Sequence, residues 1–190
     1  IQHINALFLE MNGSTNSWKG RLVLRAEHTL SIQNSKERKS TLSLFPSFSL
    51  FREMEEKHTF FVMYSRKINR PAMNMLNPFP DNYADELNIY QGNPALKPEF
   101  IHSFETGYRF FHPQWSGTAS VFHRHLGEAI SQIKRELNDS VLMMTYVNLH
   151  KASLTGCDLN GMLMPFTWWK ISFSTLFFKT SLYEKSANST

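Results

Sequence analysis

Histidine and cysteine are the side chains of widest chemical repertoire here, and neither stands in a pattern that catalysis or metal binding requires. His123 and His125 lie two residues apart, which places both on one face of a strand, but no third ligand follows nearby. Cys157 is the single cysteine, so it forms no internal disulfide, and no companion motif of a nucleophile accompanies it. We interpret the histidines as solvated strand residues and Cys157 as a small strand residue.

Charged side chains gather between residues 66 and 86. Asp81, Asp85 and Glu86 carry the oxygen ligands that Ca²⁺ prefers, but they lack EF-hand spacing and we interpret them as a solvated acidic segment. Arg66 and Arg70 could contact an anionic ligand or pair with those carboxylates. The sequence has no glycine-rich phosphate loop, nucleophile elbow or paired catalytic carboxylates. We therefore predict no catalytic residues, no metal site and no cofactor, and a protein that is not an enzyme.

Composition narrows the class of protein further. The 190 residues fit one domain, and a net charge of +4 is spread along the chain, so we expect no nucleic-acid partner. No apolar run approaches the about 18 to 20 residues of a membrane helix. Strands that alternate polar and apolar residues average to mild polarity. The composition therefore excludes a helical membrane protein and leaves a membrane β-barrel open.

Apolar and polar residues alternate with a period of two along most of the chain, which indicates strands rather than helices. Leu22 and Leu24 share one face, for example, while Arg21 and Arg25 share the other. Pro46 lies inside one such run and predicts a bulge or a locally unpaired position. We expect strands near residues 2–11, 18–32, 40–51, 57–67, 99–111, 116–134, 141–164 and 169–177, although the faces of 116–134 are too poorly patterned to assign.

The connections between these segments are of two kinds. Residues 69–98 form one long connection, dense in Asn, Pro and Asp, which cannot be helix or paired strand for long. Loops beyond about 12 to 15 residues are uncommon in compact domains and are usually functional. The other connections are short turns near residues 12–17, 34–38, 54–57, 112–115, 135–140 and 165–167. Long loops on one side and short turns on the other are typical of outer-membrane barrels.

Aromatic residues gather at one end of the predicted meander. Alternate turns of an up-and-down meander lie at the same end, which groups the first, third, fifth and seventh turns together. The aromatic residues beside those turns include all four tryptophans: Trp18, Phe51, Phe110, Phe111, Trp115, Phe166, Trp168 and Trp169. Aromatic rings settle at the lipid–water interface of membrane barrels, whereas a soluble sandwich has no reason to band them.

Alternation alone leaves three classes of protein open. In a membrane barrel the apolar faces meet lipid, whereas in a soluble β-sandwich ligand-binding domain they meet each other. A hydrolase on a β scaffold needs clustered acid–base residues, which the sequence does not show. The aromatic band and the unequal turns favour the first class. We predict an all-β, antiparallel up-and-down meander of about eight long strands, which is a partial segment of a large transmembrane β-barrel.

Several blocks of the sequence resemble the outer-membrane β-barrel region of TonB-dependent receptors, in the version abundant in Bacteroidetes. The blocks are LRAEHT at 24–29, LFPSFSL at 44–50, YSRKINRP at 64–71, LNPF at 76–79, GNPALKPE at 92–99, FETGY at 104–108 and YVNLHKASLTGCDL at 146–159. GNPALKPE before a predicted strand is the most specific. The blocks together cover most of the chain.

The resemblance implies a function for the chain. Residues 1–190 would be a single middle segment of a barrel of about 22 strands, with the plug domain and the remaining strands outside this sequence. The implied location is the cell outer membrane, and the implied partners are outer-membrane lipid, a TonB-type energy-coupling protein acting through the plug, and an imported small ligand or oligosaccharide. The protein would import a scarce nutrient such as a chelated metal, a cofactor or an oligosaccharide. Residues 69–98 would belong to the outer vestibule, with Tyr83, Asn88, Tyr90 and Gln91 as ligand contacts.

Overall fold

The computed structural model describes residues 2–33, 37–55, 57–81, 87–138 and 141–183, most of which lie in strands. The strands are β1 (Gln2–Ser14), β2 (Trp18–Gln33), β3 (Glu37–Met54), β4 (His58–Asn69), β5 (Asn88–Tyr90), β6 (Glu99–His112), β7 (Trp115–Asn138), β8 (Val141–Phe166) and β9 (Trp169–Tyr183). The helix α1 (Met73–Leu76) is a single turn. The predicted all-β fold of about eight long strands is confirmed, since only β5, with three residues, is short among the described strands.

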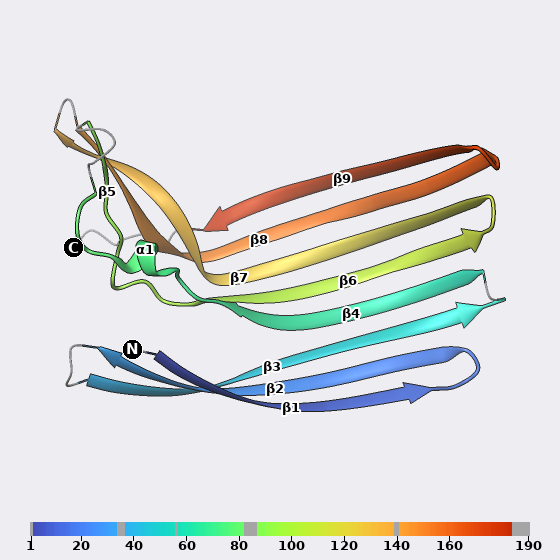
Figure 1. Ribbon diagram of the computed structural model, residues 1–190, viewed down its shortest axis with the longest axis horizontal. Coiled ribbons are helices and arrows are strands. Elements are labelled where there is room, and N and C mark those ends of the chain that lie inside the picture. The colour runs from blue at the N-terminus through green and yellow to red at the C-terminus, as the bar shows by residue number, and fades with distance from the viewer. Residues whose placement is uncertain (1, 34–36, 56, 82–86, 139–140, 184–190) are drawn as a thin grey trace. The chain divides into compact units, whose positions relative to one another are not determined.

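The long strands pair in the order of the chain. The sheet runs β1-β2-β3-β4-β6-β7-β8, and β9 pairs with β8 (Figure 1). The antiparallel register of β1 with β2 is continuous from Gln2↔Ser31 to Ser14↔Lys19. The exception to the meander is β5, which lies parallel to β8 with Asn88 opposite Leu142. The described part of the long connection therefore contains one helical turn and one short strand, in keeping with a composition that allows neither helix nor paired strand for long.

Pro46 lies within β3 without a bulge toward β2. It stands directly opposite Leu24 in a register that runs unbroken along both strands. On the other side of β3, the described pairing with β4 extends from Met54↔His58 to Ser47↔Ser65 and does not include Pro46, the residue that precedes Ser47. Proline has no N–H to give to a neighbouring strand, and it stands where that pairing has stopped. The predicted bulge is wrong on the β2 side, and the predicted unpaired position is correct on the β4 side.

The strand whose faces could not be assigned from sequence, β7, contains an irregular backbone position. Glu128 has a φ of 55°, in the left-handed region that L-residues adopt rarely and that occurs at β-bulges. Such a residue shifts the alternation of side chains on one side of it relative to the other. No single period-two pattern therefore fits the whole of residues 115–138.

The strands contribute to two compact units, which we describe separately. The first unit comprises Ile1–Arg66, Ser103–His123 and Thr155–Lys179. It contains the short turns at residues 15–17, 113–114 and 167–168, and the connection from β3 to β4. The second unit comprises Lys67–His102, Arg124–Leu154 and Thr180–Thr190, and it contains the long connection with α1 and β5.

Few side chains are buried within these units. The buried hydrophobic residues that the structure describes are Phe45, Phe61 and Phe122 in the first unit and Leu96, Ala129 and Ala152 in the second. Large apolar side chains remain open instead, with Leu7 75% and Leu42 69% exposed. A soluble sandwich requires its apolar strand faces to be packed beneath a second layer. Within the described residues, these faces are not packed in that way.

Candidate functional site

The first unit presents an apolar face. The register of β2 with β3 puts Leu22 opposite Phe48 and Ala26 opposite Leu44. Alternate residues of a strand point to the same side, so these side chains share one face, which we call the apolar face. Leu22 is 50% and Leu44 46% exposed. This face has the chemistry of a surface that meets hydrocarbon.

The opposite side of the same strands, which we call the charged face, carries paired ions. The described ion pairs on it are Glu10–Arg21 at 3.0 Å, Lys19–Glu53 at 2.8 Å and Arg25–Glu27. Glu27 is fully buried, and the Arg25 guanidinium also lies 5.5 Å from the ring centroid of Phe8 and 5.9 Å from that of Phe45. The arrangement of apolar residues on one face and charges on the other is the one expected for lipid and lumen.

Polar and aromatic contacts mark the two borders of the apolar face. At one border, His28 hydrogen-bonds Ser40 at 2.8 Å and His123 hydrogen-bonds Thr155 at 2.7 Å. At the other, Trp18 begins β2, ten residues before His28. Ten residues of strand span about 33 Å, or about 25 Å along the membrane normal at the tilt of about 40° usual in barrels. That height matches the apolar band of an outer-membrane barrel.

The predicted aromatic end is present in the first unit. Its turns lie along one edge, because Ser17 O accepts from Glu53 N at 2.8 Å, Lys57 O from Phe111 N at 2.8 Å and Gln114 O from Met164 N at 2.6 Å (Figure 1). The rings make close contacts there, with Phe110 and Trp115 centroids 4.0 Å apart. The Arg52 guanidinium lies 5.3 Å from the Trp18 ring centroid.

Strand alternation divides seven of the eight aromatic residues of that end, which the sequence grouped together. Trp18, Phe110, Trp115 and Trp169 belong to the apolar face, whereas Phe51, Phe111 and Phe166 belong to the charged face. The eighth, Trp168, lies in the turn between β8 and β9. Phe51 packs there on buried Phe61, with ring centroids 6.3 Å apart. Only the four rings on the apolar face can form an interfacial girdle.

The predicted ligand contacts lie in the second unit, where the structure describes them. Asn88 and Tyr90 are the ends of β5 and lie beside Leu142 and Met144 of β8. Tyr90 is 47% exposed, and its backbone exchanges two hydrogen bonds with Asp81, at 2.7 and 3.0 Å. Its ring is therefore open on an anchored backbone. Tyr83 lies outside the described residues.

Gln91 has a structural role that the sequence did not indicate. Its side-chain amide donates to Pro78 O at 2.7 Å, and its backbone N–H donates to Met144 O at 3.0 Å. Gln91 follows β5 directly, and Asn88 and Tyr90 are two residues apart within β5 and so share one face of it. The structure thus brings Asn88, Tyr90 and Gln91 together on one segment.

Asn148 of β8 fixes the end of the long connection, and it was not identified from sequence. Its amide N–H groups donate to Lys97 O at 3.0 Å and Glu128 O at 2.8 Å, and its carbonyl oxygen accepts from Lys97 N at 2.8 Å. Asn93 makes a similar contact by donating to Tyr146 O at 2.9 Å. Lys97 and Glu128 also form an ion pair at 3.6 Å. Both asparagines lie in the sequence blocks that carry the family resemblance. Their place in those blocks was the one signal from which the sequence could have indicated their role.

Gly92 allows α1 to approach this segment. A Cβ on Gly92 would lie 2.7 Å from Asn74 O and from the backbone N and O of Asn77. All three atoms belong to the backbone, so they cannot move aside as a flexible side chain can. The Asn93 N–H then donates to Met75 O at 2.7 Å. The glycine of the GNP motif is therefore explained by a close approach of two backbone segments.

Other titratable groups add little to the site. Burial lowers the pKa of the Arg70 guanidinium in the long connection from its usual value. Among the described residues, no group of three or more His, Cys, Asp or Glu side chains is arranged to hold a metal ion. None of the helices that the structure describes is long and apolar enough to cross a membrane.

These features define the wall of a transmembrane β-barrel. The model of the outer membrane protein beta-barrel family matches residues 1–190, and the chain belongs to that family. This confirms at the family level the resemblance carried by the sequence blocks, and it places the chain in the outer membrane.

Solved structures share the fold at low sequence identity. The siderophore receptor PirA from Pseudomonas aeruginosa superposes with a TM-score of 0.72 and 19% identity, over 95% of this chain and 32% of that one. The copper transporter OprC gives 0.73 and 13%, over 95% and 30%. The FrpB iron transporter from Neisseria meningitidis (F5-1 variant) gives 0.69 and 14%, over 98% and 27%. The chain spans less than a third of the length of these relatives. No curated protein sequence matches it.

Proposed function

We propose that this chain forms part of the wall and outer vestibule of a TonB-dependent receptor that imports a scarce nutrient across the outer membrane. The nutrient classes are a chelated metal, a cofactor or an oligosaccharide, and the activity is import rather than catalysis. The observation that carries the proposal is the wall itself, with one apolar face and one charged face of ion pairs such as Glu10–Arg21. The structural similarity to the siderophore receptor PirA, the FrpB iron transporter and the copper transporter OprC supports it.

Residues 1–190 act in this proposal as one continuous barrel segment. The plug domain and the remaining strands belong to the rest of a longer protein, and the TonB-type partner acts through that plug. Ligand binds on the outer side, and energy from the inner membrane then moves the plug so that the ligand passes the lumen. The long connection 69–98 contributes to the outer vestibule because short turns of such barrels face the periplasm and long loops face outward.

Within the vestibule, Tyr90 is the best placed of the three predicted contacts that the structure describes. Its exposed ring stands on a backbone fixed by Asp81 and by β8, so little ordering is needed when a ligand binds. Tyr83, Asn88 and Gln91 remain proposed contacts beside it. The Gln91 amide also supports the backbone of this segment by donating to Pro78 O.

Uptake by the complete receptor tests the proposal. Cells expressing it would be given radiolabelled ferric chelates, cobalamin and labelled oligosaccharides in turn, with and without a protonophore. We expect uptake of one class to stop with the protonophore and to fall about tenfold in Tyr90→Ala, the size usual for a buried aromatic contact. Trp168→Ala, at a short turn of the other unit, is the control and should leave uptake unchanged.

Two outcomes would contradict separate parts of the proposal. Uptake that persists with the protonophore would indicate a passive pore rather than an energised receptor. Energised uptake that is equal in wild type and in Tyr83→Ala, Asn88→Ala and Tyr90→Ala would remove these residues from the ligand site and leave the transport function intact.

A further inference from the structure

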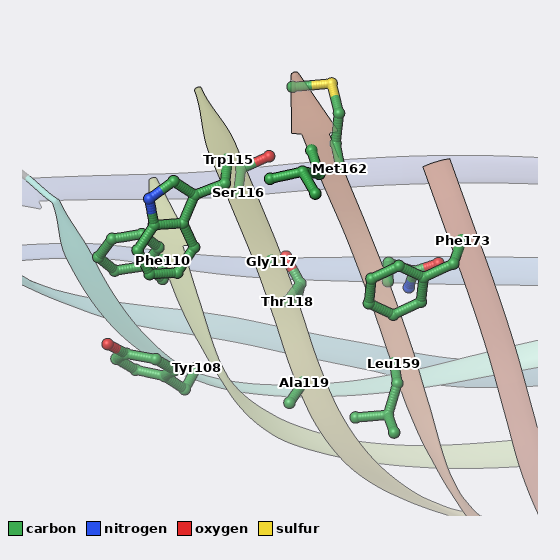
Figure 2. A pocket seen from close by; sticks show the side chains of 12 residues that line it. Tyr108, Phe110, Trp115, Ser116, Gly117, Thr118, Ala119, Leu159, Met162 and Phe173 are labelled. Atoms are coloured by element: carbon green, nitrogen blue, oxygen red, sulfur yellow. The ribbon is translucent and has the colours of Figure 1, made fainter. Parts of the chain in front are cut away.

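The apolar face of the first unit contains a hollow near its aromatic end. Figure 2 shows Tyr108, Phe110 and Trp115 on one side of it, Leu159 and Phe173 on the other, and Gly117 between them. Its volume is about 670 Å³. Cavities that hold small ligands usually measure about 300 to 1,000 Å³. We call this feature the groove.

The groove exists because two glycines face each other on neighbouring strands. Met164 N donates to Gln114 O at 2.6 Å, and His123 hydrogen-bonds Thr155 at 2.7 Å. Both contacts fit one antiparallel register of β7 with β8, in which Gly117 stands opposite Gly161. The apolar face thus lacks two adjacent side chains at this point, and the groove lies over the one of these two positions that no neighbouring side chain covers.

The two glycines are not equivalent. The ring of Phe173 lies over Gly161, in the place where a Cβ would stand. At Gly117 a Cβ would meet only Asn160 O, at 3.6 Å, an ordinary contact distance. The space above Gly117 is therefore open, whereas the space above Gly161 is occupied by the wall residue from β9.

The aromatic wall is held in place by its neighbours. Phe110 stacks on Trp115 with ring centroids 4.0 Å apart. Tyr108 hydrogen-bonds His58 through its hydroxyl and packs on Phe60 with centroids 4.8 Å apart. These contacts fix the rings before anything binds, so a guest would not have to order them.

Because the chain belongs to an outer-membrane barrel family, membrane lipid lies against this face. The apolar face meets the hydrocarbon of the bilayer, and the groove is continuous with that interface. Its lining is mostly aromatic and aliphatic, includes the uncharged polar residues Ser116, Thr118 and Asn160, and contains no charged residue. It also lies beside the short turns, which face the periplasm in such barrels. We propose that the groove holds one acyl chain of a phospholipid from the periplasmic leaflet, retained longer than the surrounding lipid.

Lipid retention by the complete receptor tests this proposal. The receptor would be purified in mild detergent, supplied with phosphatidylethanolamine and analysed by native mass spectrometry. Gly117→Leu puts a side chain into the open space without meeting the backbone closely. We expect a several-fold fall in the population that carries one phospholipid. Ala119→Leu fills the same groove from the next position on that face. It should lower phospholipid retention in the same way, and it serves as the second variant if the Gly117→Leu receptor does not insert into the membrane.

Gly20→Leu is the matched control. Gly20 stands opposite Gly13 at the same end of the apolar face, and a Cβ there would lie 3.7 Å from Leu50 Cδ1. Retention should equal that of the wild type. Equal retention in wild type and both groove variants, or equal loss in the groove and control variants, would overturn the proposal, since both indicate ordinary surrounding lipid. Co-purification of a protein in place of phospholipid, lost in Gly117→Leu, would also overturn it. Uptake of nutrient is not part of this readout, so the result is independent of the transport function.

Discussion

Asn148 shows how one side chain can replace a stretch of backbone pairing. Its amide makes both a donor and an acceptor contact with Lys97, as a neighbouring strand would, and also donates to Glu128 O beside the irregular backbone of β7. Hydrogen bonds of this kind each contribute about 1 kcal/mol net, and a buried partner left without one costs more. The end of the long connection therefore depends on a residue that lies 51 positions away.

Replacing Asn148 with Ala should loosen that segment. We expect local stability around residues 93–97 to fall by about 1 to 3 kcal/mol, which corresponds to about 5- to 150-fold faster exchange of the Lys97 amide. Hydrogen–deuterium exchange on the complete receptor measures it. Asn148→Asp keeps the acceptor for Lys97 N–H and should give a smaller effect. Asn12→Ala, on an exposed residue of β1, is the control. Unchanged exchange at residues 93–97 in Asn148→Ala would show that the three contacts do not hold the segment.

Residue roles are the part of the site that the sequence indicates least directly. The sequence located the long connection and suggested Tyr90 and Gln91 as ligand contacts, but it did not indicate that the Gln91 amide also donates to Pro78 O. Amide and aromatic side chains in a loop look alike as ligand contacts until their hydrogen bonds are known. Gly92 and Asn148 carried a signal only as members of motifs, because the contacts that explain them join distant segments.

At the scale of elements, strand alternation carries the argument, and β2 offers a test of it. Leu24 is on the apolar face, whereas its neighbour Val23 is on the charged face opposite Glu10. Lysine at the lipid-facing midplane of a barrel costs about 2 to 4 kcal/mol. We expect Leu24→Lys to destabilise the complete receptor in phospholipid vesicles by that amount, measured by guanidinium unfolding.

Val23→Lys is the matched control for that substitution. It removes a branched apolar side chain of similar size on the same strand, but the new ammonium group faces the ion pairs of the charged face. We expect a change within about 0.5 kcal/mol, as for other solvated positions. Equal losses in the two variants would mean that the faces are not lipid and lumen.

The element boundaries follow closely from period-two patterns, with instructive exceptions. Short polar turns and alternating runs located the long strands, because one face had to remain apolar throughout. The interpretation failed where local backbone geometry intervenes. Glu128, with its positive φ, broke the pattern of β7, and Pro46 was fitted into β3 where pairing with β4 ends. β5 could not be predicted, since three residues pairing in parallel with β8 leave no periodic signal.

At the scale of the whole molecule, the described strands leave large apolar side chains open. Leu7, Phe8 and Leu42 are each more than 60% exposed. Soluble monomers rarely expose large contiguous apolar patches. In the described pairing, β1 and β9 also have one strand neighbour each, so both present edges that invite association.

The isolated segment should therefore depend on detergent. Expressed alone, residues 1–190 should sediment in buffer and become dispersed when micelles cover the apolar face, as followed by ultracentrifugation and size-exclusion chromatography. The complete receptor, whose remaining strands close the edges, is the control and should elute as one species in the same detergent. A monomeric, folded segment in buffer without detergent would mean that Leu22, Leu44 and their neighbours pack against each other in water. That result would restore the soluble β-sandwich and remove the basis for placing lipid on one face and a lumen on the other.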